Sequence, residues 1–197
     1  MDAIQSFDRT VINYFYHIAS TNNLVGIIAQ VLALGTIYIV PLFLIFLWYA
    51  KSKESIKNKI LALEILASGL VSWQIISRLV KTFYFRNRPF ANSSINVQEL
   101  LFHRPDQSFP SDHASLIFAF TFALYLFGNK KLGHIFLCFS ILVSLARVAT
   151  GLHYPSDIIG GVIVGFLAAL SVYLLRIPFE KYIAYPLISL CKKVNLY

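Results

Sequence analysis

Two histidines and one aspartate are the residues of this chain best suited to covalent or acid–base chemistry. His153 and Asp157 are four positions apart with Pro155 between them, and His113 lies in an earlier segment. Imidazole gains or loses a proton near neutral pH, so either ring can act as nucleophile, acid or base. Pro155 favours a turn that folds the Asp157 carboxylate back on His153 and stabilises an imidazolium there. We therefore expect His153 to be a nucleophile, Asp157 its partner and His113 the acid.

Basic residues flank these histidines in separate segments. Six residues lie between Lys81 and Arg88, and five lie between Arg147 and the second histidine. A guanidinium offers a planar pair of donors that matches phosphate oxygens, and an ammonium offers a compact charge. Ser111 lies at the predicted start of a helix, where free N–H groups and the helix dipole favour an anion. The pattern predicts a phosphate cradle of Lys81, Arg88, Ser111 and Arg147, which requires no metal ion or cofactor.

Three further residues are secondary candidates because they lie close to the cradle in sequence. Arg78 lies one turn before Lys81, and Arg86 lies two residues before Arg88, so either could widen the cradle for a diphosphate. A snorkelling or solvent-exposed position is the more common alternative for both arginines. Asp112 could cap the helix that follows it, or lie near a second phosphate through a bound cation or a shared proton.

The elements that position these residues are apolar helices. The 197-residue chain is 57% hydrophobic and 13% charged, with a mean hydropathy of +0.67, which exceeds what the core of one soluble domain could bury. A spanning helix needs about 20 mostly apolar residues. We expect an all-α, polytopic transmembrane helix bundle that forms one domain, residues 1–197. About five spans are predicted, at Leu24–Ala50, Ile60–Thr82, His113–Phe127, Leu132–Ala149 and Ile158–Arg176.

Amphipathic segments flank the predicted spans. Residues 3–19 place apolar side chains near helical spacing with Asp8 and Arg9 between them, which predicts a helix along the membrane surface. The tail Ile177–Tyr197 follows the same pattern. No basic stretch alternates with aromatic residues in a polar context, so nucleic acid is not an expected partner.

Basic residues in the connections predict the orientation of the chain. If five helices alternate, the most basic connections share one side, which the positive-inside rule makes cytoplasmic. These basic residues are Lys51, Lys53, Lys57, Lys59, Lys130, Lys131, Arg176, Lys181, Lys192 and Lys193. The connections 83–112 and 150–157 then face the periplasm or the outside. We expect a multi-pass plasma-membrane protein with its active site on that face.

The segments that carry these residues resemble the three signatures of the type 2 phosphatidic acid phosphatase superfamily. Those signatures read Lys, six residues, Arg-Pro; Pro-Ser-Gly-His; and Ser-Arg, five residues, His, three residues, Asp. The spacing matches from Lys81 to Asp157, which we take as the catalytic core, although Asp112 replaces the glycine and Ala146 replaces the serine. The resemblance implies the same phosphate cradle, acid and nucleophile as the residues themselves.

The Pro-Ser-Asp-His variant is similar to the bacitracin-resistance-type undecaprenyl-diphosphate phosphatases. That resemblance implies hydrolysis of a polyprenyl diphosphate, such as the undecaprenyl lipid, to the monophosphate and inorganic phosphate through a phosphohistidine. A phosphatase for phosphatidylglycerol phosphate, phosphatidic acid or another lipid monophosphate is an alternative, as is a phosphotransferase. A non-enzymatic lipid-binding protein would be expected to lack a histidine or Asp157. A transporter would be expected to show polar residues near the bilayer midplane.

Overall fold

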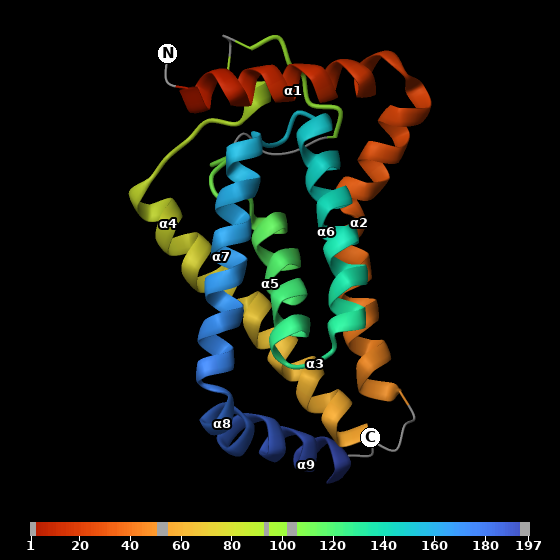
Figure 1. Ribbon diagram of the computed structural model, residues 1–197, viewed down its shortest axis with the longest axis vertical. Helices are drawn as coiled ribbons and strands as arrows, with labels where there is room; N and C mark the ends of the chain where they lie inside the picture. Colours follow the sequence, from red (N-terminus) through yellow and green to blue (C-terminus); the bar gives the residue numbers. More distant parts are fainter. Residues whose placement is uncertain (1–2, 51–54, 93–94, 102–105, 194–197) are drawn as a thin grey trace.

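The computed structural model describes residues 3–50, 55–92, 95–101 and 106–193, and no described residue lies in a strand. The bundle consists of helical segments that run lengthwise through the molecule, with the α3–α4 run oblique to the others (Figure 1). They are α2 (Asn23–Tyr49), the continuous run from α3 (Ser55–Leu70) through the π-helical η1 (Val71–Ser77) to α4 (Arg78–Phe83), α5 (Asp112–Leu126), α6 (Lys130–Ala149) and α7 (Pro155–Leu174). The predicted all-α class is therefore confirmed.

Fewer helices meet the length and hydropathy criteria for a membrane span than the five predicted. In the described part of the chain, three helices are long and apolar enough to cross a membrane: Ser55–Phe83, Lys130–Ala149 and Pro155–Leu174. A fourth candidate is the pair Ala3–Thr21 and Asn23–Thr36, which is bent by 116°. The helix α5 has 15 residues, fewer than the ~20 that a spanning helix needs. These apolar helices identify the chain as a membrane protein.

Helix α5 lies in the middle of the bundle and supplies much of its core. Ile117, Phe120 and Leu124 are almost fully buried, and they pack with buried residues of α2, α3, α6 and α7. Figure 1 shows α5 between α7 and α6. Because α5 is surrounded by other helices, its N-terminal end, which carries Ser111 and His113, is held in a fixed position.

Helices lie across both ends of the bundle. Helix α1 (Ala3–Thr21) lies across one end, and α8 (Arg176–Phe179), η3 (Glu180–Ala184) and α9 (Tyr185–Lys193) lie across the other (Figure 1). The predicted N-terminal surface helix therefore exists as a helix, and so does the described part of the tail.

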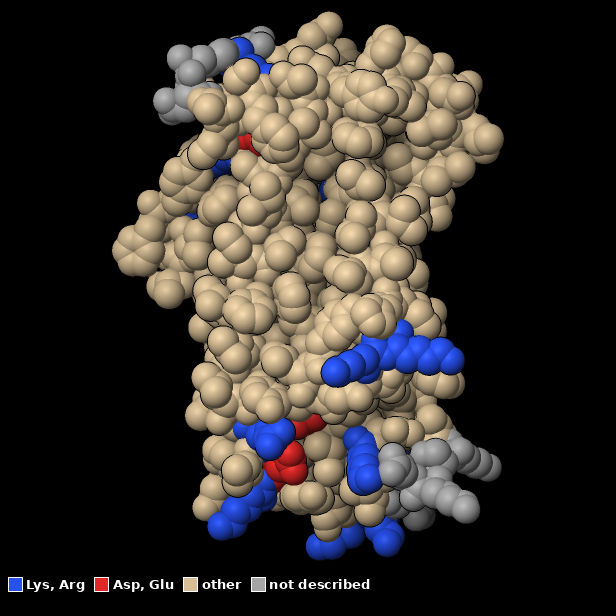
Figure 2. Space-filling view, in the orientation of Figure 1, with Lys and Arg blue, Asp and Glu red and all other residues tan. Residues whose placement is uncertain are grey.

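On the face shown in Figure 2, most lysine and arginine side chains gather toward the α8–α9 end, and few charged side chains appear on the surface above them. Lys51 and Lys53 lie outside the described residues.

Glycine residues allow α7 to approach α5 closely. A Cβ atom added at Gly165 would lie 2.7 Å from the backbone nitrogen of Ala119 and 2.8 Å from the carbonyl oxygen of Ser115. Real Cβ atoms do not approach backbone atoms this closely, so the two helices would have to move apart. By contrast, a Cβ added at Gly35 would meet only the ring of Phe139, at 3.3 Å, among the nearest atoms of other helices.

We predict that Gly165→Ala destabilises the bundle more than Gly35→Ala does. Overpacking typically costs about 1–3 kcal/mol, which corresponds to several degrees in a chain of this size. The measurement is the midpoint of thermal unfolding in detergent. Equal midpoints for the two variants would contradict the close α5–α7 contact.

Candidate functional site

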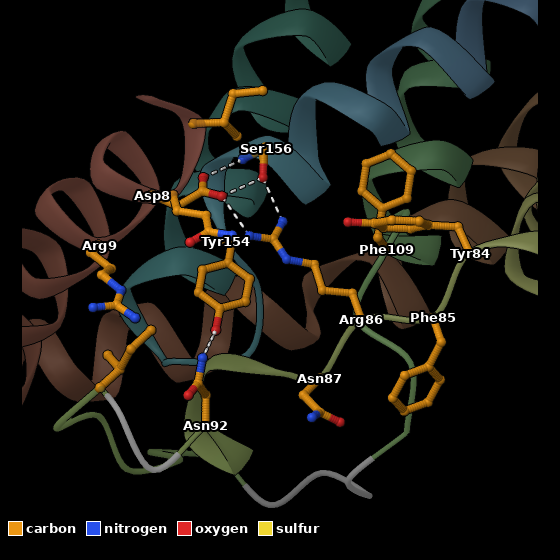
Figure 3. A pocket seen from close by; sticks show the side chains of 13 residues that line it. Asp8, Arg9, Tyr84, Phe85, Arg86, Asn87, Asn92, Phe109, Tyr154 and Ser156 are labelled. Atoms are coloured by element: carbon orange, nitrogen blue, oxygen red, sulfur yellow. Dashed lines mark hydrogen bonds and ion pairs between the residues drawn. The ribbon is translucent and has the colours of Figure 1, made fainter. Parts of the chain in front are cut away.

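The candidate site lies at the end of the bundle that α1 covers. The C-terminal end of α4 and the loop after it approach from one direction, and the N-terminal ends of α5 and α7 and the C-terminal end of α6 meet there. Figure 3 shows the part of this region that faces α1. Residues far apart in the sequence are thus brought to one place. The sequence predicted that the connections 83–112 and 150–157 lie on the same face of the membrane.

The Asp157 carboxylate was expected to fold back on the His153 ring, and its hydrogen bond to the preceding backbone goes to Tyr154. Helix α7 begins at Pro155, three residues earlier than expected, because the fixed φ of proline suits the first helical position. Asp157 therefore lies in the first turn of α7, where its carboxylate accepts a 2.8 Å hydrogen bond from the backbone N–H of Tyr154. This contact fixes the side chain at the helix start.

The Asp157 carboxylate is fully buried and has donors on both oxygens. Its Oδ2 accepts a hydrogen bond from the Ser108 hydroxyl, and its Oδ1 lies 2.8 Å from Nη1 of Arg86. The same Oδ2 lies 3.5 Å from Nδ1 of His153, somewhat longer than an ordinary hydrogen bond. The ion pair and hydrogen bonds compensate the cost of burying this charge.

The partner of Nε2 fixes the tautomer of the His153 ring. This histidine is only 2% exposed, and its Nε2 lies 3.0 Å from Nη1 of Arg88. A guanidinium donates but cannot accept, so Nε2 must carry the lone pair. In a neutral ring the proton then lies on Nδ1, which faces Asp157. This is the state in which Nε2 can attack an electrophile.

Arg88 connects the histidine to the preceding loop. Its Nη1 also donates to the carbonyl oxygen of Leu152 at 2.9 Å, and its Nη2 to that of Gln107 at 3.4 Å. Asp106, an exposed residue, accepts from the same guanidinium at 2.7 Å. Arg88 itself is 3% exposed. Its position beside His153 agrees with the predicted convergence of cation and nucleophile.

Lys81 and Asp112 form an ion pair, with Nζ 2.5 Å from Oδ2. Asp112 is the first residue of α5, and the N-cap is Ser111, whose side chain accepts from the N–H of Ala114 at 3.5 Å. The expectation that Asp112 could cap this helix is therefore wrong, because the carboxylate turns toward Lys81. His113 follows in the same first turn and is half-buried.

Arg147 is the largest of the almost fully buried side chains, at 1% exposure. Its Nη1 donates to the carbonyl oxygen of Ala33 at 3.1 Å, whereas Nε and Nη2 have no hydrogen-bond acceptor among the described residues. Its charge interacts with those of Arg88, Asp112 and Asp106. Arg147 therefore has buried donors without an acceptor and lies close enough to Arg88 and Asp112 to feel their charges, and an oxyanion would satisfy these donors.

The two secondary arginines have different environments. Arg78 is exposed on α4 and forms no ion pair within the described part of the chain. Arg86 lies between the carboxylates of Asp157 and Asp8. Burial alone would lower the pKa of Arg86, but the two carboxylates raise it above its ordinary value, so the guanidinium stays charged.

Asp8, Ser108 and Ser156 had no predicted role, yet all three contact the site. Asp8 is 1% exposed and accepts from Arg86 and Ser156. One signal was available in the sequence, since Asp8 lies four positions before the buried Ile12 and so shares its helix face. No comparable periodicity marks the two serines, which lie at loop and helix-start positions.

A cavity of about 680 Å³ lies between α1 and the loop that precedes the site. Asp8, Arg86 and Tyr154 contribute to its wall, together with aromatic residues of the loop (Figure 3). Burial raises the pKa of the Tyr154 hydroxyl, so this ring stays neutral beneath the guanidinium that stacks on it. Among the described residues, no group of three or more His, Cys, Asp or Glu side chains is placed to hold a metal ion.

The unpaired donors of Arg147 predict that the folded protein binds an oxyanion. A ligand of the folded state raises stability by about 2.7 kcal/mol at a hundredfold excess over its dissociation constant. We expect phosphate or tungstate to raise the thermal unfolding midpoint of the wild type but not of Arg147→Gln. Arg176→Gln, at the opposite end of the bundle, should respond like the wild type. An equal response in Arg147→Gln would contradict this placement of the anion.

Known proteins resemble this chain both in sequence and in fold. The bacitracin transport permease protein BcrC of Bacillus licheniformis is 32% identical over 136 residues, which cover 69% of this chain and 64% of that protein. The undecaprenyl-diphosphatase BcrC of Bacillus subtilis (strain 168) is 35% identical over 130 residues, 64% of each chain. The chain thus spans slightly less than two thirds of the length of both relatives.

The crystal structure of Aquifex aeolicus LpxE shares the fold, with a TM-score of 0.64 over 87% of this chain and 95% of that one at 22% identity. The family model described as the PAP2 superfamily matches residues 59–180, which include both histidines and all the predicted cradle residues. The chain therefore belongs to the PAP2 superfamily.

Proposed function

We propose that this protein is an integral membrane phosphatase that hydrolyses a polyprenyl diphosphate, such as undecaprenyl diphosphate, to the monophosphate and inorganic phosphate. The observation that carries the proposal is the arrangement around His153, in which Nε2 faces Arg88 and Nδ1 faces the buried Asp157. A nucleophile oriented by a carboxylate, next to a cation that can bind phosphate, suits phosphoryl transfer. The name of the Bacillus subtilis relative, an undecaprenyl-diphosphatase, agrees with a role at this class of lipid.

In the first step, Nε2 of His153 attacks the terminal phosphorus, and the bond from phosphorus to the bridging oxygen breaks. His113 donates a proton to that oxygen as the lipid monophosphate leaves. Asp157 stabilises the positive charge that the ring gains while the phosphohistidine exists. In the second step, His113 takes a proton from water, the water oxygen bonds to phosphorus, and the bond to Nε2 breaks to release inorganic phosphate.

The phosphate cradle would stabilise the charge that spreads over the equatorial oxygens in both steps. Arg147 has unpaired donors for this task, and Arg88 already lies beside the nucleophile. Lys81 is paired with Asp112, so a diphosphate would have to share or displace that carboxylate. The catalytic core would extend from Lys81 to Asp157 within a single domain.

The position of the site at one end of the bundle suits a lipid substrate. A polyprenyl chain can remain in the membrane while its headgroup reaches the helix ends. Since basic side chains gather at the opposite end, the positive-inside rule favours a site that faces the periplasm or the outside (Figure 2). No metal ion or cofactor takes part in the proposed steps.

The test is phosphate release from undecaprenyl diphosphate and from phosphatidic acid, in detergent with EDTA present. We expect the wild type to prefer the diphosphate, and we expect His153→Ala to lose activity by a factor of at least about 10⁴, since the nucleophile is removed. Arg176→Gln, which changes an exposed arginine at the opposite end of the bundle, is the matched control and should retain activity.

Each other outcome contradicts a defined part of the proposal. Robust activity in His153→Ala would exclude this histidine as the nucleophile. Preference for phosphatidic acid would assign the site to lipid monophosphates, and wild-type protein inactive on both lipids would favour a binding protein.

A further inference from the structure

Helix α1 is joined to the candidate site by one buried ionic network (Figure 3). The Arg86 guanidinium lies between two carboxylates, with Nη2 2.6 Å from Oδ2 of Asp8 and Nη1 2.8 Å from Oδ1 of Asp157. Asp8 belongs to α1, whereas Asp157 belongs to α7. A surface helix is thereby linked, through Arg86, to the residue that faces the nucleophile.

Ser156 ties this network together. The backbone N–H of Ser156 donates to Oδ1 of Asp8 at 2.9 Å, and its hydroxyl donates to Oδ2 at 2.6 Å. The same Ser156 hydroxyl accepts from Nη1 of Arg86 at 2.6 Å. Asp8 and Asp157 are 1% and 0% exposed, so neither charge could remain unpaired at low cost.

An aromatic ring also packs against the flat face of the Arg86 guanidinium. It stacks on the ring of Tyr154, with Cζ 3.9 Å from the ring centroid, and the Tyr154 hydroxyl accepts from the side-chain amide of Asn92 at 3.2 Å. Two fixed carboxylates and one fixed ring leave Arg86 a single orientation. In that orientation it holds Oδ1 of Asp157, which leaves Oδ2 facing His153.

We propose that Asp8 and Arg86 are positioning residues that hold the Asp157 carboxylate aimed at His153. Helix α1 is then part of the apparatus that orients the nucleophile, in addition to covering the end of the bundle. The inference rests on the proposed function, and it gives Arg86 a role different from the two that the sequence left open, which were widening the phosphate cradle and a snorkelling or exposed position. Two carboxylates already neutralise Arg86, whereas a phosphate-binding arginine needs unpaired donors of the kind that Arg147 has.

The split between kcat and KM separates positioning from phosphate binding. For Arg86→Gln and Asp8→Asn we expect kcat on undecaprenyl diphosphate to fall on the order of 100-fold, as for a displaced reacting group. KM should stay within about twofold, because neither residue contacts the substrate. The double variant should lose little more than Arg86→Gln alone, since both changes act through one carboxylate.

Chemical rescue with free guanidinium is a second test of the positioning role of Arg86. Arg86 lies in the wall of the 680 Å³ cavity, so Arg86→Ala leaves a space that a free guanidinium ion can enter. Millimolar guanidinium should restore part of kcat in Arg86→Ala and none in His153→Ala. Arg9→Ala, which removes a neighbouring arginine from the same cavity wall, is the matched control and should keep the wild-type kcat.

Other outcomes overturn the inference in distinguishable ways. A tenfold rise in KM with unchanged kcat in Arg86→Gln would show that Arg86 binds phosphate. Unchanged kcat and KM in both single variants would show that neither residue positions Asp157. If Arg86→Gln does not fold, Arg86→Lys keeps the charge but cannot bridge two carboxylates, and unchanged kcat there would equally overturn the inference. Inactive wild-type protein would refute the proposed function itself.

Discussion

A carboxylate buried in the first turn of a membrane helix is stable only if nearby groups compensate its charge. At Asp157, Arg86 supplies the opposite charge, while the Ser108 hydroxyl and the backbone N–H of Tyr154 supply hydrogen bonds. The orientation of the nucleophile depends on this carboxylate. It faces Nδ1 of His153, and the state of that ring decides whether Nε2 can act as a nucleophile.

The helix bundle meets this requirement by fixing the ends of several helices relative to one another. The backbone N–H of Ser111, before α5, donates to the carbonyl oxygen of Asp157 at 3.1 Å, and Gly165 lets α5 and α7 lie in close contact. Gly151, with a φ of 77°, turns the chain between Arg147 and His153, and few residues other than glycine adopt that conformation. Rigid packing thus brings together segments that the sequence separates.

Local features of the site could be predicted from the sequence because they depend on spacing. The four-residue interval from His153 to Asp157 places both groups at one helix start, and the apolar runs locate each helix to within a few residues. Contacts between distant segments could not be predicted in this way. The pairing of Arg86 with Asp8 depends on how α1 lies across the bundle, and Asp112 pairs with Lys81 only because α4 and α5 converge. The spacing of residues in a single sequence does not predict which distant segments come into contact.

The most direct test of the account is to detect the covalent intermediate. Purified protein would be mixed with undecaprenyl diphosphate, quenched in alkali, in which phosphohistidine survives, and analysed by mass spectrometry of its peptides. The account predicts phosphate on His153 of the wild type during turnover, and none at any residue in His153→Ala. Phosphate on a different residue, or turnover with no phosphorylated peptide at any time point, would contradict it.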